Sequence, residues 1–131
     1  MKRLASVILC WGLIASLACS GPGPNTSPIC TADFRAGLLV YVKDSVTNAG
    51  VASGASLVVR ASGFKDSVAA PRDRPEVDGF PLQAAHERAG TYQVEVSKPG
   101  YATWSLNNVQ VTRNECHVNT VSLTALLQPA T

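Results

Sequence analysis

The chain has 131 residues, of which 46% are apolar and 15% charged, so it has room for one globular domain but not for two. It carries 11 basic and 9 acidic residues, but Lys2 and Arg3 belong to a leader that we expect to be removed. The remaining chain has 11 − 2 = 9 basic against 9 acidic residues. This balance gives no reason to expect nucleic acid as a partner.

Residues 1–18 have the pattern of a secretory signal peptide. Two basic residues precede an apolar run, residues 4–17, which is shorter than the roughly 20 residues of a membrane-spanning helix. Residues 16–19 (SLAC) resemble the lipobox of bacterial lipoproteins, with matches at Ala18 and Cys19 but not at the two positions before them. The resemblance implies cleavage before Cys19 and its lipidation. The alternatives are ordinary secretion with cleavage after Ser20, and a leader that stays in place as a membrane helix.

Residues 19–29 are rich in Gly, Pro and Ser, so we predict a flexible tether, of which residues 20–28 span roughly 30 Å when extended. Two cysteines remain after the leader and tether, Cys30 and Cys116, each just outside a predicted strand. An even pair in an exported domain predicts a disulfide. For a loop of this length the chain-entropy estimate of its stabilisation is roughly 4–5 kcal/mol. The alternative is a two-ligand metal site completed by His86 or His117.

The rest of the chain alternates short strand patterns with turn signals. The first strand has Leu38, Val40 and Val42 on one face, and a turn rich in Asp, Asn and Gly follows Asp44. The predicted strands are residues 35–44, 55–62, 64–69, 91–97, 103–113 and 117–127, with a short strand or an irregular crossover at residues 80–87. Residues 70–79 hold two prolines and five charges, which predicts a surface loop.

Two features of these patterns are specific enough to be tested. After the strand at residues 91–97, Lys98-Pro99-Gly100 predicts a type II turn with a positive φ at Gly100. In residues 103–113 the apolar alternation changes phase across Asn107-Asn108, which predicts a β-bulge or a break into two strands. With about seven strands and no helical period, we predict an all-β fold, an antiparallel sandwich of two sheets with immunoglobulin-like architecture.

The strand and turn motifs resemble the carboxypeptidase regulatory-like domain over residues 30–128. The family pattern has a first strand that ends in Asp, a Gly-Val step, a second strand with a small residue, then G-x-Y-x-V-x-V and a P-G-Y turn. The matching positions here are Asp44, Gly50, Val51, Ala55, Val58, Gly90, Tyr92, Val94, Val96, Pro99, Gly100 and Tyr101. The resemblance implies a seven-stranded prealbumin-like sandwich, with Asn48 at a turn position where Gly is usual. It implies no shared catalytic residues.

Few residues point to a binding or catalytic site. His86-Glu87 are neighbours on an extended chain and point to opposite faces, so they do not predict an acid–base pair. Glu115-Cys116-His117 would suit an activated thiol only if Cys116 were reduced. Tyr101 and Trp104 are a candidate aromatic platform for a sugar ring, against the alternative that they pack on the core. The charged residues 71–78 are a candidate docking loop for a partner protein.

We therefore expect an exported, non-catalytic lipoprotein of the cell envelope without cofactor or metal. Its expected role is structural or as a protein-interaction module, held at the membrane through a lipid anchor on Cys19. The alternative role is a carbohydrate-binding module at the cell surface, and the alternative location is the secreted fraction. A small hydrolase is the third hypothesis.

Overall fold

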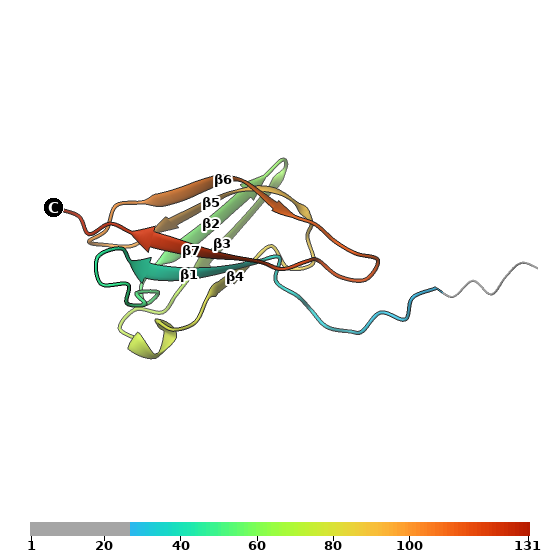
Figure 1. Cartoon of the computed structure of the whole chain (residues 1–131), viewed down its shortest axis with the longest axis horizontal. Coiled ribbons are helices and arrows are strands. Elements are labelled where there is room, and N and C mark those ends of the chain that lie inside the picture. Colours follow the sequence, from blue (N-terminus) through green and yellow to red (C-terminus); the bar gives the residue numbers. More distant parts are fainter. Residues whose placement is uncertain (1–26) are drawn as a thin grey trace, which may run out of the picture.

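A computed structural model describes residues 27–131, which form two β-sheets that face each other (Figure 1). The predicted signal peptide at residues 1–18, the predicted lipidation residue Cys19 and the predicted tether up to residue 26 lie outside the described residues. Within residues 27–131 the structure has no helix that is long and apolar enough to cross a membrane.

The seven strands divide into a three-stranded and a four-stranded sheet, with the orders β4-β1-β7 and β3-β2-β5-β6. Their bounds are β1 Leu38–Asp44, β2 Ser56–Ala61, β3 Phe64–Ala69, β4 Leu82–Ala84, β5 Gly90–Ser97, β6 Trp104–Val111 and β7 Val121–Leu127, with one 3₁₀ turn at Pro75–Val77. The all-β prediction is confirmed, and so is the short strand within residues 80–87. The predicted loop at residues 70–79 contains the 3₁₀ turn and no strand.

The core lies between the two sheets and is built by alternate residues of the strands. In β1, Leu38, Val40 and Val42 are buried, as the alternation predicted. The opposite sheet contributes the buried side chains Leu57, Val59, Tyr92, Val94, Val96, Val109 and Val111. Because successive strand residues point to opposite faces, one face of each sheet is apolar and packs inward, giving a sandwich-like fold.

One pairing corrects the prediction of a purely antiparallel sandwich. β7 runs parallel to β1 over its whole length, from Leu38 opposite Val121 to Asp44 opposite Leu127. All other strand pairs are antiparallel. The chain reaches this parallel register because the connection after β6 returns to the end of the domain where β1 begins (Figure 1). The N-terminal segment leaves from that same end, and the C-terminus lies at the other.

Two predicted strands were too long at their N-terminal ends. The first strand begins at residue 38 and not 35, because the backbone of Arg35 and Gly37 pairs with the loop after β4. The last strand begins at residue 121 and not 117. The four residues before it turn back toward the end of β6, where Asn119 N donates to Thr112 O at 2.8 Å and Val118 bridges Arg113.

The bulge and the turn formed as predicted. Between β5 and β6, Tyr92 lies opposite Val109 and Val94 opposite Leu106, so Asn107 and Asn108 together face one residue of β5. Asn108 has φ +59°, the left-handed conformation that Asn tolerates. At the turn after β5, Gly100 has φ +83° and Tyr101 N donates to Lys98 O at 3.1 Å.

Candidate functional site

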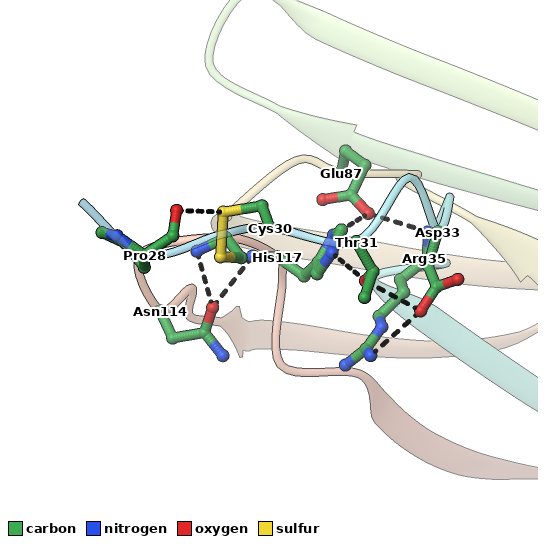
Figure 2. The surroundings of a disulfide bond; sticks show 9 residues. Pro28, Cys30, Thr31, Asp33, Arg35, Glu87, Asn114 and His117 are labelled. Carbon is green, nitrogen blue, oxygen red and sulfur yellow. Dashed lines mark hydrogen bonds and ion pairs between the residues drawn. A yellow bond between two sulfur atoms is a disulfide. The ribbon is translucent and has the colours of Figure 1, made fainter. Parts of the chain in front are cut away.

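The N-terminal segment is joined to the domain by a disulfide between Cys30 and Cys116 (Figure 2). The two residues are 86 positions apart in sequence and their Cα atoms are 5.2 Å apart. Cys30 is exposed at the start of the described chain, and Cys116 lies half-buried in the connection between β6 and β7. The predicted pairing is confirmed. It covalently links the residue that follows the predicted tether to the connection between β6 and β7.

The loop that carries Cys116 is held by one asparagine. Asn114 Oδ1 accepts hydrogen bonds from the backbone N–H groups of Cys116 and His117, both at 2.9 Å, and Asn114 N donates to His117 O at 2.9 Å. Asparagine favours such turns because its side chain bonds the backbone two or three residues ahead. The turn places Cys116 at the surface and the neighbouring His117 in the interior.

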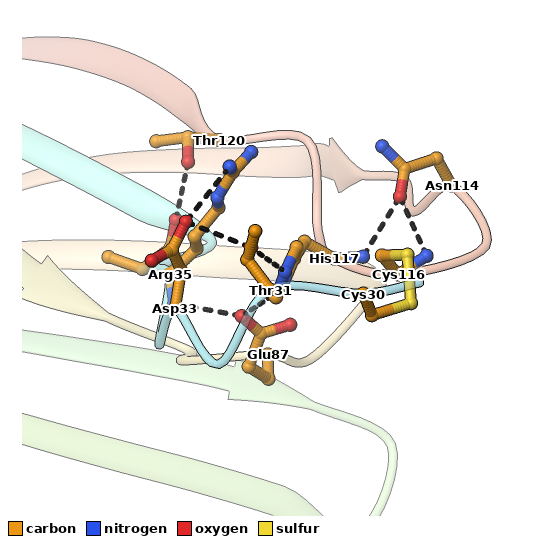
Figure 3. A network of polar contacts seen from close by, with 10 residues as sticks. Cys30, Thr31, Asp33, Arg35, Glu87, Asn114, Cys116, His117 and Thr120 are labelled. Carbon is orange, nitrogen blue, oxygen red and sulfur yellow. Dashed lines mark hydrogen bonds and ion pairs between the residues drawn. A yellow bond between two sulfur atoms is a disulfide. The ribbon is translucent and has the colours of Figure 1, made fainter. Parts of the chain in front are cut away.

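His117 is buried and contacts two segments that are distant in sequence (Figure 3). Its Nδ1 lies 2.9 Å from Glu87 Oε1, and its Nε2 lies 3.1 Å from Thr31 Oγ1. Both ring nitrogens therefore have partners, one in the loop between β4 and β5 and one beside Cys30. The disulfide joins Cys30 to Cys116, and the imidazole contact joins the next residue of each segment, Thr31 and His117.

The hydroxyl of Thr31 links the imidazole to a second ion pair. Thr31 Oγ1 donates to Asp33 Oδ2 at 3.0 Å, and the same carboxylate lies 3.4 Å from Arg35 Nη2. When Thr31 gives its hydrogen to Asp33, its oxygen accepts from His117 Nε2. If Nδ1 also donates to the carboxylate of Glu87, both ring nitrogens carry a hydrogen. A neutral imidazole that donates through Nδ1 to Glu87 instead accepts at Nε2, and the Thr31 hydrogen turns toward it.

Glu87 is fixed by the N-terminal segment as well as by His117. Its Oε1 accepts the backbone N–H of Arg35 at 2.8 Å, and its own N–H donates to Arg35 O at 2.9 Å. The hydrogen bond from the Arg35 backbone is the main reason that the pKa of this carboxyl lies below its usual value. Burial opposes this shift, and the hydrogen bond and electrostatic attraction of His117 add to it. Glu87 also has φ +50°, and Ala85 has φ +55°. The loop adopts this uncommon backbone to direct Glu87 toward the segment.

A carboxylate, an imidazole and a hydroxyl in series is also the order of groups in nucleophilic catalysis. In this protein the imidazole is buried and the Thr31 hydroxyl is already bonded to Asp33. Thr120 Oγ1 adds a further bond, to Ala36 O at 2.8 Å. Apart from the contact between His117 and Glu87, every one of these contacts has the N-terminal segment on one side, so the geometry serves to attach residues 30–36 to the end of the sandwich.

Comparison with known families extends this picture to the C-terminal part of the chain. A PEGA domain model matches residues 80–130. The PEGA domain is a β-rich domain found in bacterial envelope proteins and typical of exported proteins, and the match covers less than half of the chain. No curated protein matches the chain. The match indicates a non-catalytic module of the envelope or the exterior.

The region matched by the PEGA model includes two of the three groups at the site. Glu87 lies in the loop between β4 and β5, and His117 in the connection between β6 and β7. Thr31 and Cys30 come from outside the matched region. The site is therefore a junction between the PEGA-like part and the N-terminal segment.

The residues predicted as a ligand platform lie elsewhere. Tyr101 and Trp104 follow β5 within the PEGA-like region, and both are half-buried against the core. The Tyr101 hydroxyl donates to Asp44 Oδ2 at 3.0 Å. His86 stacks on Phe34 with ring centres 4.9 Å apart, while Glu87 contacts His117, so the two neighbours do face different partners as predicted.

The network of Glu87, His117 and Thr31 was not predicted from the sequence. A signal was present, because Thr31 directly follows Cys30 and His117 directly follows Cys116. A disulfide brings the residues that follow its two cysteines close to one another. What the sequence did not show is the position of Glu87, which depends on the positive φ of two non-glycine residues. Within the described residues, no three His, Cys, Asp or Glu side chains gather closely enough to hold a metal ion.

Proposed function

We propose that the protein is a non-catalytic lipoprotein of the bacterial cell envelope. In this proposal residues 1–18 are a signal peptide, Cys19 carries the lipid and residues 19–29 are the tether of a domain at residues 30–128. The domain serves as a structural or protein-interaction module near the membrane, without a cofactor or a nucleic-acid partner. The PEGA match supports an envelope or exterior location.

The observation that carries the proposal is the disulfide at the point where the tether meets the fold. Cys30 is bonded to Cys116, and structural disulfides persist in oxidising compartments outside the cytoplasm. A force on the tether would therefore be transmitted through the disulfide to the β6–β7 connection. The hydrogen bonds among Thr31, His117 and Glu87 reinforce this attachment. An attachment of this kind suits a domain that is held at a surface through its N-terminus.

The finer family assignment belongs to the same proposal. We assign residues 30–128 to the carboxypeptidase regulatory-like domains, with a prealbumin-like topology. Supporting this, the Asp at the end of the first strand and the Tyr of the P-G-Y turn, both in the family pattern, are joined by a hydrogen bond between Asp44 and Tyr101. The positive φ of Asn48, +59°, explains why a position where Gly is usual accepts Asn.

Labelling with a radioactive or clickable fatty acid in a bacterial host tests the anchor. The wild-type chain should incorporate the label and sediment with membranes, and Cys19→Ala should lose both properties. Cys10→Ala is the matched control, because it removes a cysteine of the leader without touching the lipobox. Incorporation of label into Cys19→Ala, or release of the unlabelled wild-type chain into the medium, would refute the lipoprotein assignment.

A second candidate function is carbohydrate binding at the cell surface. A polar hollow of about 480 Å³ lies beside the bulge of β6 and is lined in part by Gln93, Asn107 and Asn108. Amide side chains of this kind bond sugar hydroxyls through both their donor and acceptor groups. The test is binding of envelope glycans to two variants. If Asn107→Ala abolishes binding and Trp104→Phe leaves it unchanged, the site lies at the bulge. The reverse result would place it at the Tyr101–Trp104 platform.

A further inference from the structure

A second hollow opens at the end of the sandwich from which the N-terminal segment leaves. It measures about 610 Å³ and is lined by three connections: the β2–β3 hairpin tip, the loop between β4 and β5, and the residue Arg113 after β6. Figure 1 shows these connections at the same end of the two sheets. Its size lies within the range of about 300–1,000 Å³ typical of small-molecule sites.

The two arginines that line the hollow form no ion pair with an acidic residue of the described chain. Residues 27–131 contain six arginines, and Arg35, Arg60 and Arg74 each form an ion pair. In the part of the chain that the structure describes, no carboxylate pairs with the other three arginines. Two of those three, Arg88 and Arg113, line this hollow. Both guanidinium groups are exposed to solvent at this hollow, and a guanidinium without an acidic partner is free to form charge-assisted hydrogen bonds with an anion.

The acidic residue on the rim forms no ion pair with either arginine. Glu87 lines the hollow, but its Oε1 accepts the backbone N–H of Arg35 and faces His117 Nδ1 at 2.9 Å. Asp66, the nearest acid on β3, accepts the backbone N–H of Ala85 at 3.0 Å. Both carboxylates thus hold the loop between β4 and β5, and neither forms an ion pair with Arg88 or Arg113.

Arg88 is held in place before any ligand arrives. Its guanidinium carbon lies 4.3 Å from the centre of the Phe64 ring, a cation–π contact, and Phe64 packs edge-on against Tyr92. The Tyr92 hydroxyl donates to Arg88 O at 2.9 Å and fixes the backbone. A guanidinium that is ordered in advance loses little entropy when it binds an anion.

We propose that this hollow binds the carboxylate of an acidic sugar, a hexuronic acid or a glycan that carries one. A planar guanidinium bonds a carboxylate through two parallel N–H groups. The hydroxyls of Ser62 and Thr91, which also line the hollow, supply partners for ring hydroxyls. A peptide ligand is less well served, because an extended peptide gains affinity by pairing with a free strand edge. Here half of the lining lies in a hairpin tip and loops, and three further residues lie in β5, which already pairs with both β2 and β6.

The test is a titration of the folded domain with D-glucuronate followed by amide NMR. D-Glucose, which has the same ring without the carboxylate, is the control ligand, and inorganic phosphate and trialanine are the competing anions. Glucuronate should shift the signals of residues 88–91 in a saturable way, and glucose should not. Arg113→Gln should weaken glucuronate binding about tenfold, equivalent to ~1.4 kcal/mol. Arg72→Gln, at an arginine of another hollow, should leave it unchanged.

Several results would overturn the proposal. Equal shifts with glucose would show that the carboxylate is not recognised, and equal or tighter binding of phosphate or trialanine would assign the hollow to another anion. If Arg113→Gln binds glucuronate with the affinity of the wild type and its spectrum is otherwise unchanged, Arg113 does not contribute to the site. Arg88→Lys then serves as the second variant, because it keeps the charge but removes the bidentate geometry. Unchanged affinity in that variant would equally refute carboxylate recognition by the arginines.

Discussion

The hydroxyl of Tyr101 donates to the carboxylate of Asp44, with Oη and Oδ2 3.0 Å apart, and joins the turn after β5 to the end of β1 across 57 positions of sequence. The other carboxylate oxygen of Asp44 accepts the backbone N–H groups of Val46 and Thr47, both at 2.8 Å. One buried carboxylate therefore organises its own turn and anchors a second turn from the opposite sheet. The first strand's final Asp and the P-G-Y motif act as one structural unit.

Replacing Tyr101 with Phe should destabilise the domain while keeping its ring in the core. The substitution removes one hydrogen bond and leaves Asp44 Oδ2 without the hydroxyl donor of Tyr101. We expect the midpoint of thermal unfolding to fall by about 4–8 °C, the shift for one lost hydrogen bond in a domain of this size. Tyr41→Phe is the control, because Tyr41 is partly exposed on the outer face of β1. An equal shift in both variants would contradict the role of the Asp44 bond.

Stability should fall in acid because of two carboxyl groups. The backbone N–H groups of Thr47 and Val46 lower the pKa of Asp44 from 3.8, and that of Arg35 lowers the pKa of Glu87 from 4.5. Both folded pKa values lie below the unfolded ones, so the unfolded chain takes up protons first as pH falls. The stabilisation is complete above the unfolded pKa values and is lost as pH drops through the folded ones.

The measurement is the urea midpoint as a function of pH. We expect a constant midpoint from neutral pH to about 5.5 and a decline below about 4.5. The double variant Asp44→Asn, Glu87→Gln should be less stable at neutral pH but should decline less in acid. Glu76→Gln, on the exposed 3₁₀ turn, should keep the wild-type profile. An acid decline in the double variant as steep as that of wild type would show that other groups cause it.

Reducing the disulfide should both destabilise the domain and release its N-terminal segment. The double variant Cys30→Ser, Cys116→Ser should lose about 2–5 kcal/mol of unfolding free energy. Locally, residues 30–36 would keep their hydrogen bonds to Glu87, His117 and the neighbouring loops and the stacking of Phe34 on His86, but no covalent link. Trypsin should therefore cut after Arg35 faster in the variant than in the oxidised protein. Cleavage after Arg72, in an already exposed loop, is the internal control; equal acceleration at both sites would indicate global unfolding without local release.

The sequence predicted the strands well wherever apolar alternation determined them. Phe64–Ala69 was predicted with the same bounds, and the phase change at Asn107-Asn108 correctly indicated a bulge. Predictions failed where long-range pairing decided the outcome. The parallel register of β1 with β7 depends on the β6–β7 connection returning to the start of β1, and no local pattern encodes this. Glu87 and His117 were each identified in the sequence, but with neighbours in sequence rather than with each other.

The turn after β5 gives the sharpest test of backbone geometry. Gly100 has φ +83°, and a Cβ added there would meet no atom within 4 Å, so a larger side chain costs only backbone strain. Gly100→Val should lose at least about 1–2 kcal/mol of unfolding free energy, since a β-branched residue resists the left-handed region. Gly79→Val is the matched control, because a Cβ there also has free space and the residue has no positive φ. Urea unfolding of both variants measures the difference; an equally small effect would mean that in solution the turn does not need a positive φ at Gly100.

The unfolding free energy of Gly100→Asn should lie between those of the wild type and Gly100→Val, because Asn tolerates the left-handed region, as Asn48 and Asn108 do in this protein.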